Sequence, residues 1–310
     1  MNKTHLILGV AATMLLATSA AVIAAVPAPL WEFKFDDVAS GVQAINTGSD
    51  PNAANAFLTM LTKNTNVPTA RRLPGGPSGL ASDYCWGGGV TYFAQVPGSQ
   101  VGGISNLNQV TCTGWYKSTS PVPITPQYNR VFLWGNRHNW DQGMVVDFNP
   151  QDRGYNQLGF EVNDYYNRDN DGGGDGYAGP VVNDVNVWHF WAITYDGTQT
   201  SNNVKIYMGD TAASVSLIGT ASITYVPLTG PPINNPTGII RNAGGNFNLA
   251  WNEDWNNNNG FTGYQDDIRI FNGVMAVADM ETVRQGDLVP EPGTLSLLVV
   301  AGMALLRRRK

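Results

Sequence analysis

Hydrophobic and polar residues alternate in short runs through the middle of the chain, and turn-forming Gly, Asn and Pro separate the runs. This period of two residues is typical of β-strands, whose side chains point alternately to the two faces of a sheet. The pattern predicts a short helix over 276–284, ended by Gly286. We therefore expect an all-β, two-sheet antiparallel sandwich that forms one large domain over residues 26–286. The predicted strands are 30–35, 110–116, 130–134, 144–148, 158–162, 188–195, 204–208, 247–251 and 265–271.

Both ends of the chain depart from this pattern. Residues 1–25 combine a cation at Lys3, an apolar run and small residues around Ala25, which is the layout of a secretory signal peptide. An N-terminal membrane anchor is the alternative. At the other end, the apolar run 294–306 lies between a Pro-Glu-Pro turn and four cations. A helix of that length spans about 20 Å, less than the roughly 30 Å of a bilayer core.

The order of these C-terminal features resembles the PEP-CTERM sorting signal of Gram-negative bacteria. The resemblance implies that residues 287–310 are a sorting tail, recognised by an exosortase-type membrane peptidase. It also implies export to the cell envelope, cell surface or extracellular matrix, with the C-terminal helix as a transient membrane anchor. A simple tail anchor is the alternative. The matching residues are a Pro-Glu-Pro motif and a basic end, namely Pro290, Glu291, Pro292, Arg307, Arg308, Arg309 and Lys310.

The charge balance of the middle of the chain excludes one class of partner. The whole chain has 18 Lys and Arg against 24 Asp and Glu, and five of the cations but only one acid lie in the two apolar ends. The remainder has 13 basic residues against 23 acidic ones, a net charge near −10. Such a domain does not neutralise a phosphate backbone, so we expect no nucleic-acid binding.

Two segments resemble laminin-G-like, concanavalin A-type jelly rolls. WHFWAITYDGTQTSNNVKIYMGD (188–210) is similar to their central hairpin, and GYQDDIRIFNGVMAVADMETV (263–283) is similar to their closing strand and helix. FKFDD (33–37) and GWYKS (114–118) fit earlier strands in the same order. The resemblance implies a jelly-roll domain. Segments 164–180 and 229–260 depart from it as insertions rich in Asn and Gly, so the resemblance assigns no ligand there.

Two carboxylates near the ends of the domain are candidate calcium ligands. Asp266 falls in phase with Ile268 and Ile270, so its side chain is expected on the buried side of its sheet. An ionised carboxylate there needs a cation or several hydrogen-bond donors. Asp36 follows the first strand, and the family resemblance implies that first and last strands are neighbours and that acids near the two termini hold a structural calcium. Turn capping or pairing with Arg269 is the alternative.

A second, weaker calcium candidate lies in the loop NRDNDGGGDGY (167–177). Its acidic and amide side chains recur at every second residue before a glycine, as in the first half of an EF-hand loop. Position 12 is Ala178 where that motif requires Glu, which argues against an EF-hand. A looser calcium site and a solvated acidic loop remain open. The candidate ligands are Asn167, Asp169, Asp171 and Asp175.

The mature domain contains two cysteines, Cys85 and Cys112. An even pair in an exported chain favours a disulfide. A pair of reduced core thiols is the alternative.

The carboxylates do not match a glycosidase of this fold, which needs two carboxyl groups across the scissile bond. The nearest combination is Glu161 with Asp164 or Asp147, without a second glutamate in the motif. There is no phosphate-binding loop, nucleophile elbow or zinc pattern in the sequence. We therefore predict a non-catalytic protein, with a divergent glycoside hydrolase as the less favoured alternative.

Tryptophans beside amides and acids favour carbohydrate binding, because sugar rings stack on aromatic faces and hydroxyls pair with planar polar groups. The sequence thus predicts a surface or matrix protein that binds an extracellular polysaccharide or cell-surface glycan. A purely structural or adhesive coat protein, with these tryptophans as caps of the sandwich, is the alternative. The candidate residues are Trp134, Trp140, Trp251, Asp254 and Trp255.

Overall fold

The computed structural model describes thirteen segments of the chain. Within them, all strand pairs are antiparallel and form two eight-stranded sheets, accompanied by one α-helix, α2 (Val277–Asp287). The expected all-β sandwich with one short helix is confirmed. The helix runs past Gly286, where the sequence predicted its end. The described residues are 26–36, 41–51, 56–62, 65–88, 91–119, 129–134, 143–149, 157–162, 175–178, 184–223, 238–240, 244–250 and 263–289.

The first sheet, which we call sheet A, has the strand order β14-β13-β12-β7-β16-β5-β4, and β1 also pairs with β16. Trp31 of β1 lies opposite Ile270 of β16, so the first and last strands are neighbours, as the family resemblance implied. The strands are β1 (Trp31–Phe33), β4 (Arg72–Pro74), β5 (Tyr84–Gly87), β7 (Gln109–Ser118), β12 (His189–Asp196), β13 (Val204–Asp210), β14 (Ser216–Ala221) and β16 (Gly263–Asn272).

The second sheet, sheet B, has the strand order β11-β10-β9-β8-β15-β6-β3-β2. Four of its strands, β2, β3, β6 and β11, were not predicted, because they are short or lack a clear alternation, and β11 lies within the segment 164–180 that was interpreted as an insertion. The 3-10 turn η1 (Gly98–Gln100) follows β6. The strands are β2 (Gln43–Ile45), β3 (Phe57–Thr62), β6 (Tyr92–Val96), β8 (Asn129–Trp134), β9 (Met144–Asn149), β10 (Gln157–Val162), β11 (Asp175–Ala178) and β15 (Phe247–Leu249).

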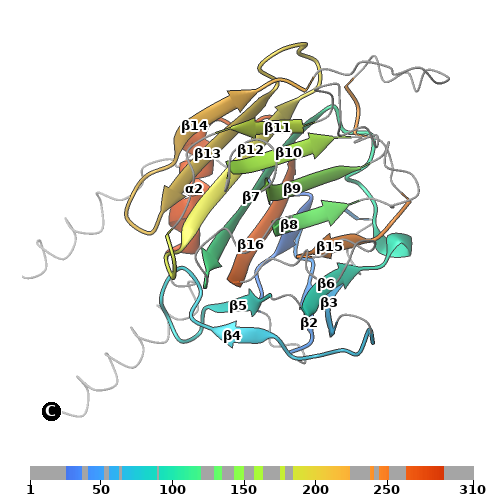
Figure 1. Ribbon diagram of the computed structural model, residues 1–310, viewed down its shortest axis with the longest axis vertical. Helices are drawn as coiled ribbons and strands as arrows, with labels where there is room; N and C mark the ends of the chain where they lie inside the picture. Colours follow the sequence, from blue (N-terminus) through green and yellow to red (C-terminus); the bar gives the residue numbers. More distant parts are fainter. Residues whose placement is uncertain are drawn as a thin grey trace, which may run out of the picture.

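The elements form three layers. Figure 1 shows sheet B in front of sheet A, with α2 behind sheet A. The main hydrophobic core lies between the sheets, and a second cluster lies between sheet A and α2. Both faces of sheet A are therefore buried, which explains why its central strands are almost continuously apolar. The largest core side chains include Trp31, Trp86, Trp134, Trp191 and Phe160, and the second cluster includes Trp115, Phe190, Phe271 and Met280. None of the helices in the described residues is long and apolar enough to cross a membrane.

A bulge in β16 interrupts the alternation of its side chains. Asp266 lies opposite Trp115 of β7 and Arg269 lies opposite Thr113, so two residues of β16 face the single Gly114. Asp267 takes a left-handed backbone conformation at φ 50° there. A Cβ on Gly114 would lie 2.6 Å from the side chain of Ile268, so the bulge also requires a glycine opposite it.

The bulge corrects the expected position of Asp266. Ile268 and Ile270 belong to the core between the sheets, whereas the ionisable groups around Asp266 are those of Asp267, Asp83, Cys85 and Asp36. Asp266 is fully buried, as expected. It does not share a face with the two isoleucines, because the extra residue in β16 shifts the period of two at that point.

Arg269 joins both termini of the domain to sheet A. Its guanidinium donates to Glu32 of β1 at 2.7 Å and to Asp267 at 2.9 Å. It also holds the two carboxylate oxygens of Asp287, at the end of α2, at 2.7 and 3.0 Å. The indole of Trp115 donates to the same Asp287 carboxylate at 2.9 Å. The side chains of Arg269 and Asp287 are only 6% and 5% exposed, so this is a buried, bidentate pair.

Burial and the neighbouring charges shift the pKa values of Arg269 and Asp287 in opposite directions. Burial alone would lower the pKa of Arg269, but Asp287 and Asp267 raise it well above its usual value, so the guanidinium stays charged. Burial raises the pKa of Asp287, although Arg269 lowers it. Removing one partner of such a pair leaves the other charge buried without compensation, which is costly. Asp287, which was predicted as the first residue of the sorting tail 287–310, is therefore part of the folded domain.

The predicted disulfide is wrong. Cys85 and Cys112 are both free, buried thiols. Cys85 lies in the cluster between sheet A and α2, whereas Cys112 lies in the core between the sheets. Strand β16 also separates β5 from β7. Burial raises the pKa of Cys85 to about 12 and raises that of Cys112 still further, so both behave as inert core thiols.

We predict that reducing agent does not change the melting temperature of the folded protein, because no cross-link is broken. Thiol titration should find two reactive groups after denaturation without reductant and none before it. A melting temperature that falls by several degrees in dithiothreitol would contradict the free-thiol assignment.

We also predict that Asp287→Asn lowers the free energy of unfolding by about 3 kcal/mol, since Arg269 loses a charged, bidentate partner in a buried site. Urea denaturation measures this loss. The control is Asp184→Asn, which removes a carboxylate that lies 3.8 Å from His189 and is 69% exposed. That change should cost less than about 1 kcal/mol. Equal losses in the two variants would contradict the role of burial.

Candidate functional site

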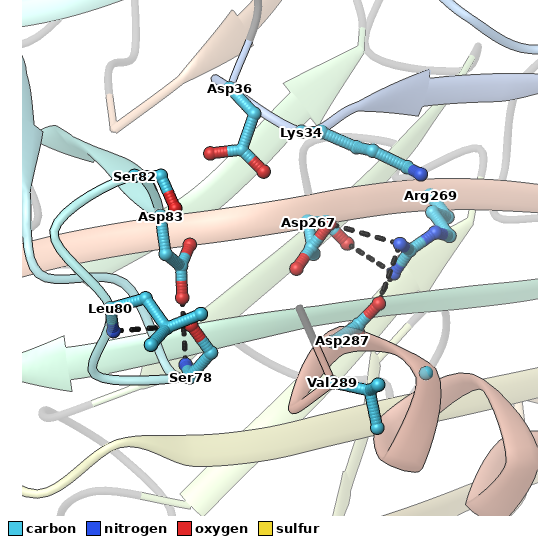
Figure 2. A pocket seen from close by; sticks show the side chains of 11 residues that line it. Lys34, Asp36, Ser78, Leu80, Ser82, Asp83, Asp267, Arg269, Asp287 and Val289 are labelled. Carbon is cyan, nitrogen blue, oxygen red and sulfur yellow. Dashed lines mark hydrogen bonds and ion pairs between the residues drawn. The ribbon is translucent and has the colours of Figure 1, made fainter. Parts of the chain in front are cut away.

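A cavity of about 240 Å³ opens beside the β16 bulge. Three parts of the chain meet around it, namely the end of β1, the turn between β4 and β5, and the end of α2. Figure 2 shows the carboxylates of Asp36, Asp83 and Asp267 around one space, with Arg269 and Asp287 to one side. The remaining lining residues are Lys34, Ser78, Leu80, Ser82, Gly286 and Val289.

Backbone donors fix two of the carboxylates. Asp36 accepts the N–H of Tyr84 at 2.8 Å, and its carbonyl oxygen accepts from Arg72 at 2.7 Å. Asp83 accepts the N–H of Ser78 at 2.7 Å, inside the β4–β5 turn. The turn therefore holds Asp83 in place next to the bulge, as expected for Asp in a tight turn.

Asp266 has one carboxylate oxygen without a partner. Its Oδ1 accepts the N–H of Asp267 at 2.8 Å, but its buried Oδ2 has no hydrogen-bond donor. A Cβ on Gly76 would lie 2.0 Å from Asp83 Oδ1 and 2.5 Å from Asp266 Oδ2. Oxygens of Asp83 and Asp266 thus approach the same point, and only glycine fits at position 76.

The site has more negative than positive charge. Six carboxylates, Asp36, Asp83, Asp266, Asp267, Asp287 and Glu32, surround three cations, Lys34, Arg72 and Arg269. Burial, followed by the charges of Asp267 and Asp83, raises the pKa of Asp266 well above its usual value. Burial and Asp287 likewise raise the pKa of Asp267, although Arg269 lowers it. Protons or a bound cation must supply the missing positive charge.

The donor set fits a hard cation such as calcium, which takes oxygen ligands from carboxylates, carbonyls and water. The structure brings Asp36 and Asp266, the two residues predicted from the sequence, into the same acidic region. It adds Asp83, which no sequence pattern had identified because its turn is remote from both termini. In the part of the chain that the structure describes, no three His, Cys, Asp or Glu side chains already have metal-ligating geometry. A cation would therefore need the carboxylates to adjust around it, with Asp83 and Asp266 as the pair that already approach each other.

The other predicted ligand residues lie elsewhere or outside the described residues. Asn167, Asp169 and Asp171 are outside them, and Asp175 begins β11, opposite Glu161 of β10. Of the predicted glycan-binding residues, Trp140, Trp251, Asp254 and Trp255 are also outside the described residues. The prediction that Trp134 binds a glycan is wrong, because this side chain is 1% exposed in the core between the sheets and has no face available to a sugar. The signal peptide, Pro290–Pro292 and the basic end likewise lie outside the described residues.

Two of the residues considered for catalysis, Glu161 and Asp147, lie on neighbouring strands of sheet B. Glu161 is 4% exposed in β10, and Asp147 lies on the neighbouring β9, opposite Gly159. Asp164 is outside the described residues. Burial lowers the pKa of His189, and its nearest acid is Asp184 at 3.8 Å. This histidine stacks on Tyr116, which is a packing role.

Two solved structures show which fold this is. One is domain 4 of AbnA, a GH43 extracellular arabinanase from Geobacillus stearothermophilus, solved in complex with arabinotriose. The similarity covers 84% of this chain and 100% of that domain, at 16% sequence identity and a TM-score of 0.50. The other is the binding domain of botulinum neurotoxin DC, solved in complex with rat synaptotagmin II. The similarity covers 84% of this chain and 52% of that chain, at 13% sequence identity and a TM-score of 0.50. No family model and no curated protein matches the chain. At these identities the likeness shows the fold alone, which is the expected jelly-roll sandwich.

Proposed function

We propose that this protein is an exported, non-catalytic carbohydrate-binding protein of the cell surface or extracellular matrix. The observation that carries the proposal is the likeness to the arabinanase domain, which this chain matches over that domain's whole length and which was solved with a bound arabinotriose. The polysaccharide is extracellular, in keeping with the signal peptide and sorting tail expected from the sequence. The tail is recognised by an exosortase-type peptidase and holds the chain in the membrane until it is processed.

A binding role fits the described residues better than a hydrolytic one. Retaining and inverting glycosidases both need two carboxyl groups on either side of the scissile bond. The acids gathered at the β16 bulge are held by Arg269 and by backbone donors where the two ends of the domain meet. Such a cluster suits structural stabilisation.

We further propose that calcium stabilises the domain at this cluster. Asp83 and Asp266 would hold the ion, with Asp36 at the rim of the cavity. The unpartnered Oδ2 of Asp266 supports this, because a buried carboxylate oxygen without a donor is costly and a cation would satisfy it. When bound, calcium would supply the positive charge that the six carboxylates lack.

The carbohydrate proposal is tested by applying the exported protein to arrays of neutral and acidic polysaccharides. We expect retention on one class of polysaccharide, without release of reducing sugar during prolonged incubation. Glu161→Gln should bind as the wild type does, since no catalytic carboxylate is removed. If the wild type releases reducing sugar and Glu161→Gln does not, the protein is a glycoside hydrolase and the binding proposal is wrong. If no polysaccharide retains the protein, a structural coat protein is favoured.

The calcium proposal predicts a higher melting temperature in calcium than in excess chelator. An ion at a hundred times its dissociation constant adds about 2.7 kcal/mol, or roughly 5–10 °C for a domain of this size. Asp266→Asn should remove the shift, because it replaces a carboxylate ligand with an amide. The control is Asp184→Asn, because the side chain of Asp184 is 69% exposed. This variant should keep the calcium-dependent rise in melting temperature. Identical melting curves in calcium and in chelator would exclude the site.

A further inference from the structure

One row of paired residues crosses the whole of sheet B in register. Gln43 of β2 lies opposite Thr59 of β3, Thr59 opposite Gln95 of β6, and Gln95 opposite Asn248 of β15. The row continues across the remaining strands through Leu133, Val145, Glu161 and Asp175. We call the first four residues, Gln43, Thr59, Gln95 and Asn248, the amide row. At a strand spacing of about 4.8 Å, the amide row is about 14 Å long.

The amide row lies on the outer face of sheet B. Its chain neighbours Leu58, Ala94 and Phe247 belong to the core between the sheets, so the alternating residues of the same strands point away from it. Hydrogen bonds join the row in pairs, from Gln43 to Thr59 at 3.2 Å and from Gln95 to Asn248 at 2.8 Å. These bonds fix the planes of the amides and so set a fixed pattern of donors and acceptors.

Two apolar side chains lie beside the row on the same face. Phe57 of β3 is opposite Ile45 of β2, and each is 36% exposed. An exposed phenylalanine next to ordered amides is the combination that binds sugars, because the ring stacks on the C–H face of a pyranose while hydroxyls pair with the amides. A sheet face that only contacts water needs neither an exposed phenylalanine nor ordered amides.

Asn248 fixes the inner end of the amide row. Its side chain is fully buried, and its Oδ1 accepts a hydrogen bond from Gln95 Nε2 at 2.8 Å. This bond holds the Gln95 amide in one position, so a ligand meets a preformed hydrogen-bonding partner there.

We propose that the amide row and Phe57 bind a neutral polysaccharide, and this inference rests on the proposed carbohydrate-binding function. Phe57 stacks against one sugar ring, and Gln43, Thr59 and Gln95 hydrogen-bond hydroxyls along the chain. The buried Asn248 holds the Gln95 amide in place. The glycan is neutral because the four residues of the row include no cation and the middle of the chain has a net charge near −10. An acidic polysaccharide would be repelled.

The test is affinity electrophoresis of the exported protein in gels that contain a neutral glucan, arabinan or xylan, or the acidic polymer alginate. The wild type should be retarded by a neutral polymer. Phe57→Ala and Gln43→Ala should each weaken binding about ten-fold, the expected effect of losing one stacking or hydrogen-bonding contact. Phe57→Trp should bind at least as tightly as the wild type, which a merely structural role for Phe57 would not produce.

Matched controls separate this site from general damage. Leu217→Ala changes an apolar residue that is 50% exposed on β14 of sheet A, and Gln285→Ala changes an exposed amide on α2. Both should bind normally, and melting curves should show that all variants fold. Wild-type binding that is unchanged in Phe57→Ala and Gln43→Ala would overturn this site but leave the proposed function standing. Retardation by alginate alone would overturn the neutral ligand, and no retardation in any gel would overturn both proposals.

Discussion

The buried charge of Arg269 is the constraint on which the ends of the domain depend. A guanidinium that is almost inaccessible to water must have its partners in place. They are Glu32 of the first strand, Asp267 of the same strand as Arg269, and Asp287 of the closing helix. The first strand, the last strand and the closing helix are therefore fixed by one set of hydrogen bonds. The rest of sheet A is then free to bury both of its faces, one against sheet B and one against α2.

The same constraint explains the acidic cavity. The β16 bulge turns Asp267 toward Arg269 and leaves Asp266 beside the β4–β5 turn, so more carboxylates gather there than the guanidinium can neutralise. Proteins seldom keep an unpartnered buried oxygen such as Asp266 Oδ2 without a use for it. A cation site and a structural ion pair would thus share one strand, with Arg269 on one side of the bulge and the cation on the other.

The sequence was sufficient for the fold class and for most strands of sheet A, because runs such as 188–195 and 204–208 are long and strongly periodic. It was insufficient for β2, β4 and β11, each of only three or four residues, where tertiary pairing and not pattern decides the conformation. Alternation also failed at Asp266, since a bulge is set by the opposite Gly114 and is invisible within β16 itself. Asp83 and the amide row could not be predicted either, because both depend on the register between strands that are far apart in the chain.

The two faces of the sandwich differ in a way that suits a protein with a tail to be processed. The outer side of sheet A is occupied by α2 and by the ion pairs that hold the root of the C-terminal segment at Asp287. A ligand bound there would compete with the contacts that close the domain. The outer side of sheet B has no such task at its β2–β3–β6 end, where Gln43, Thr59 and Phe57 are at least partly exposed. With the proposed ligand on sheet B and Asp287 on the side of sheet A, the two proposed functions would use opposite faces of the sandwich, so that a bound glycan would not compete with the contacts of Asp287.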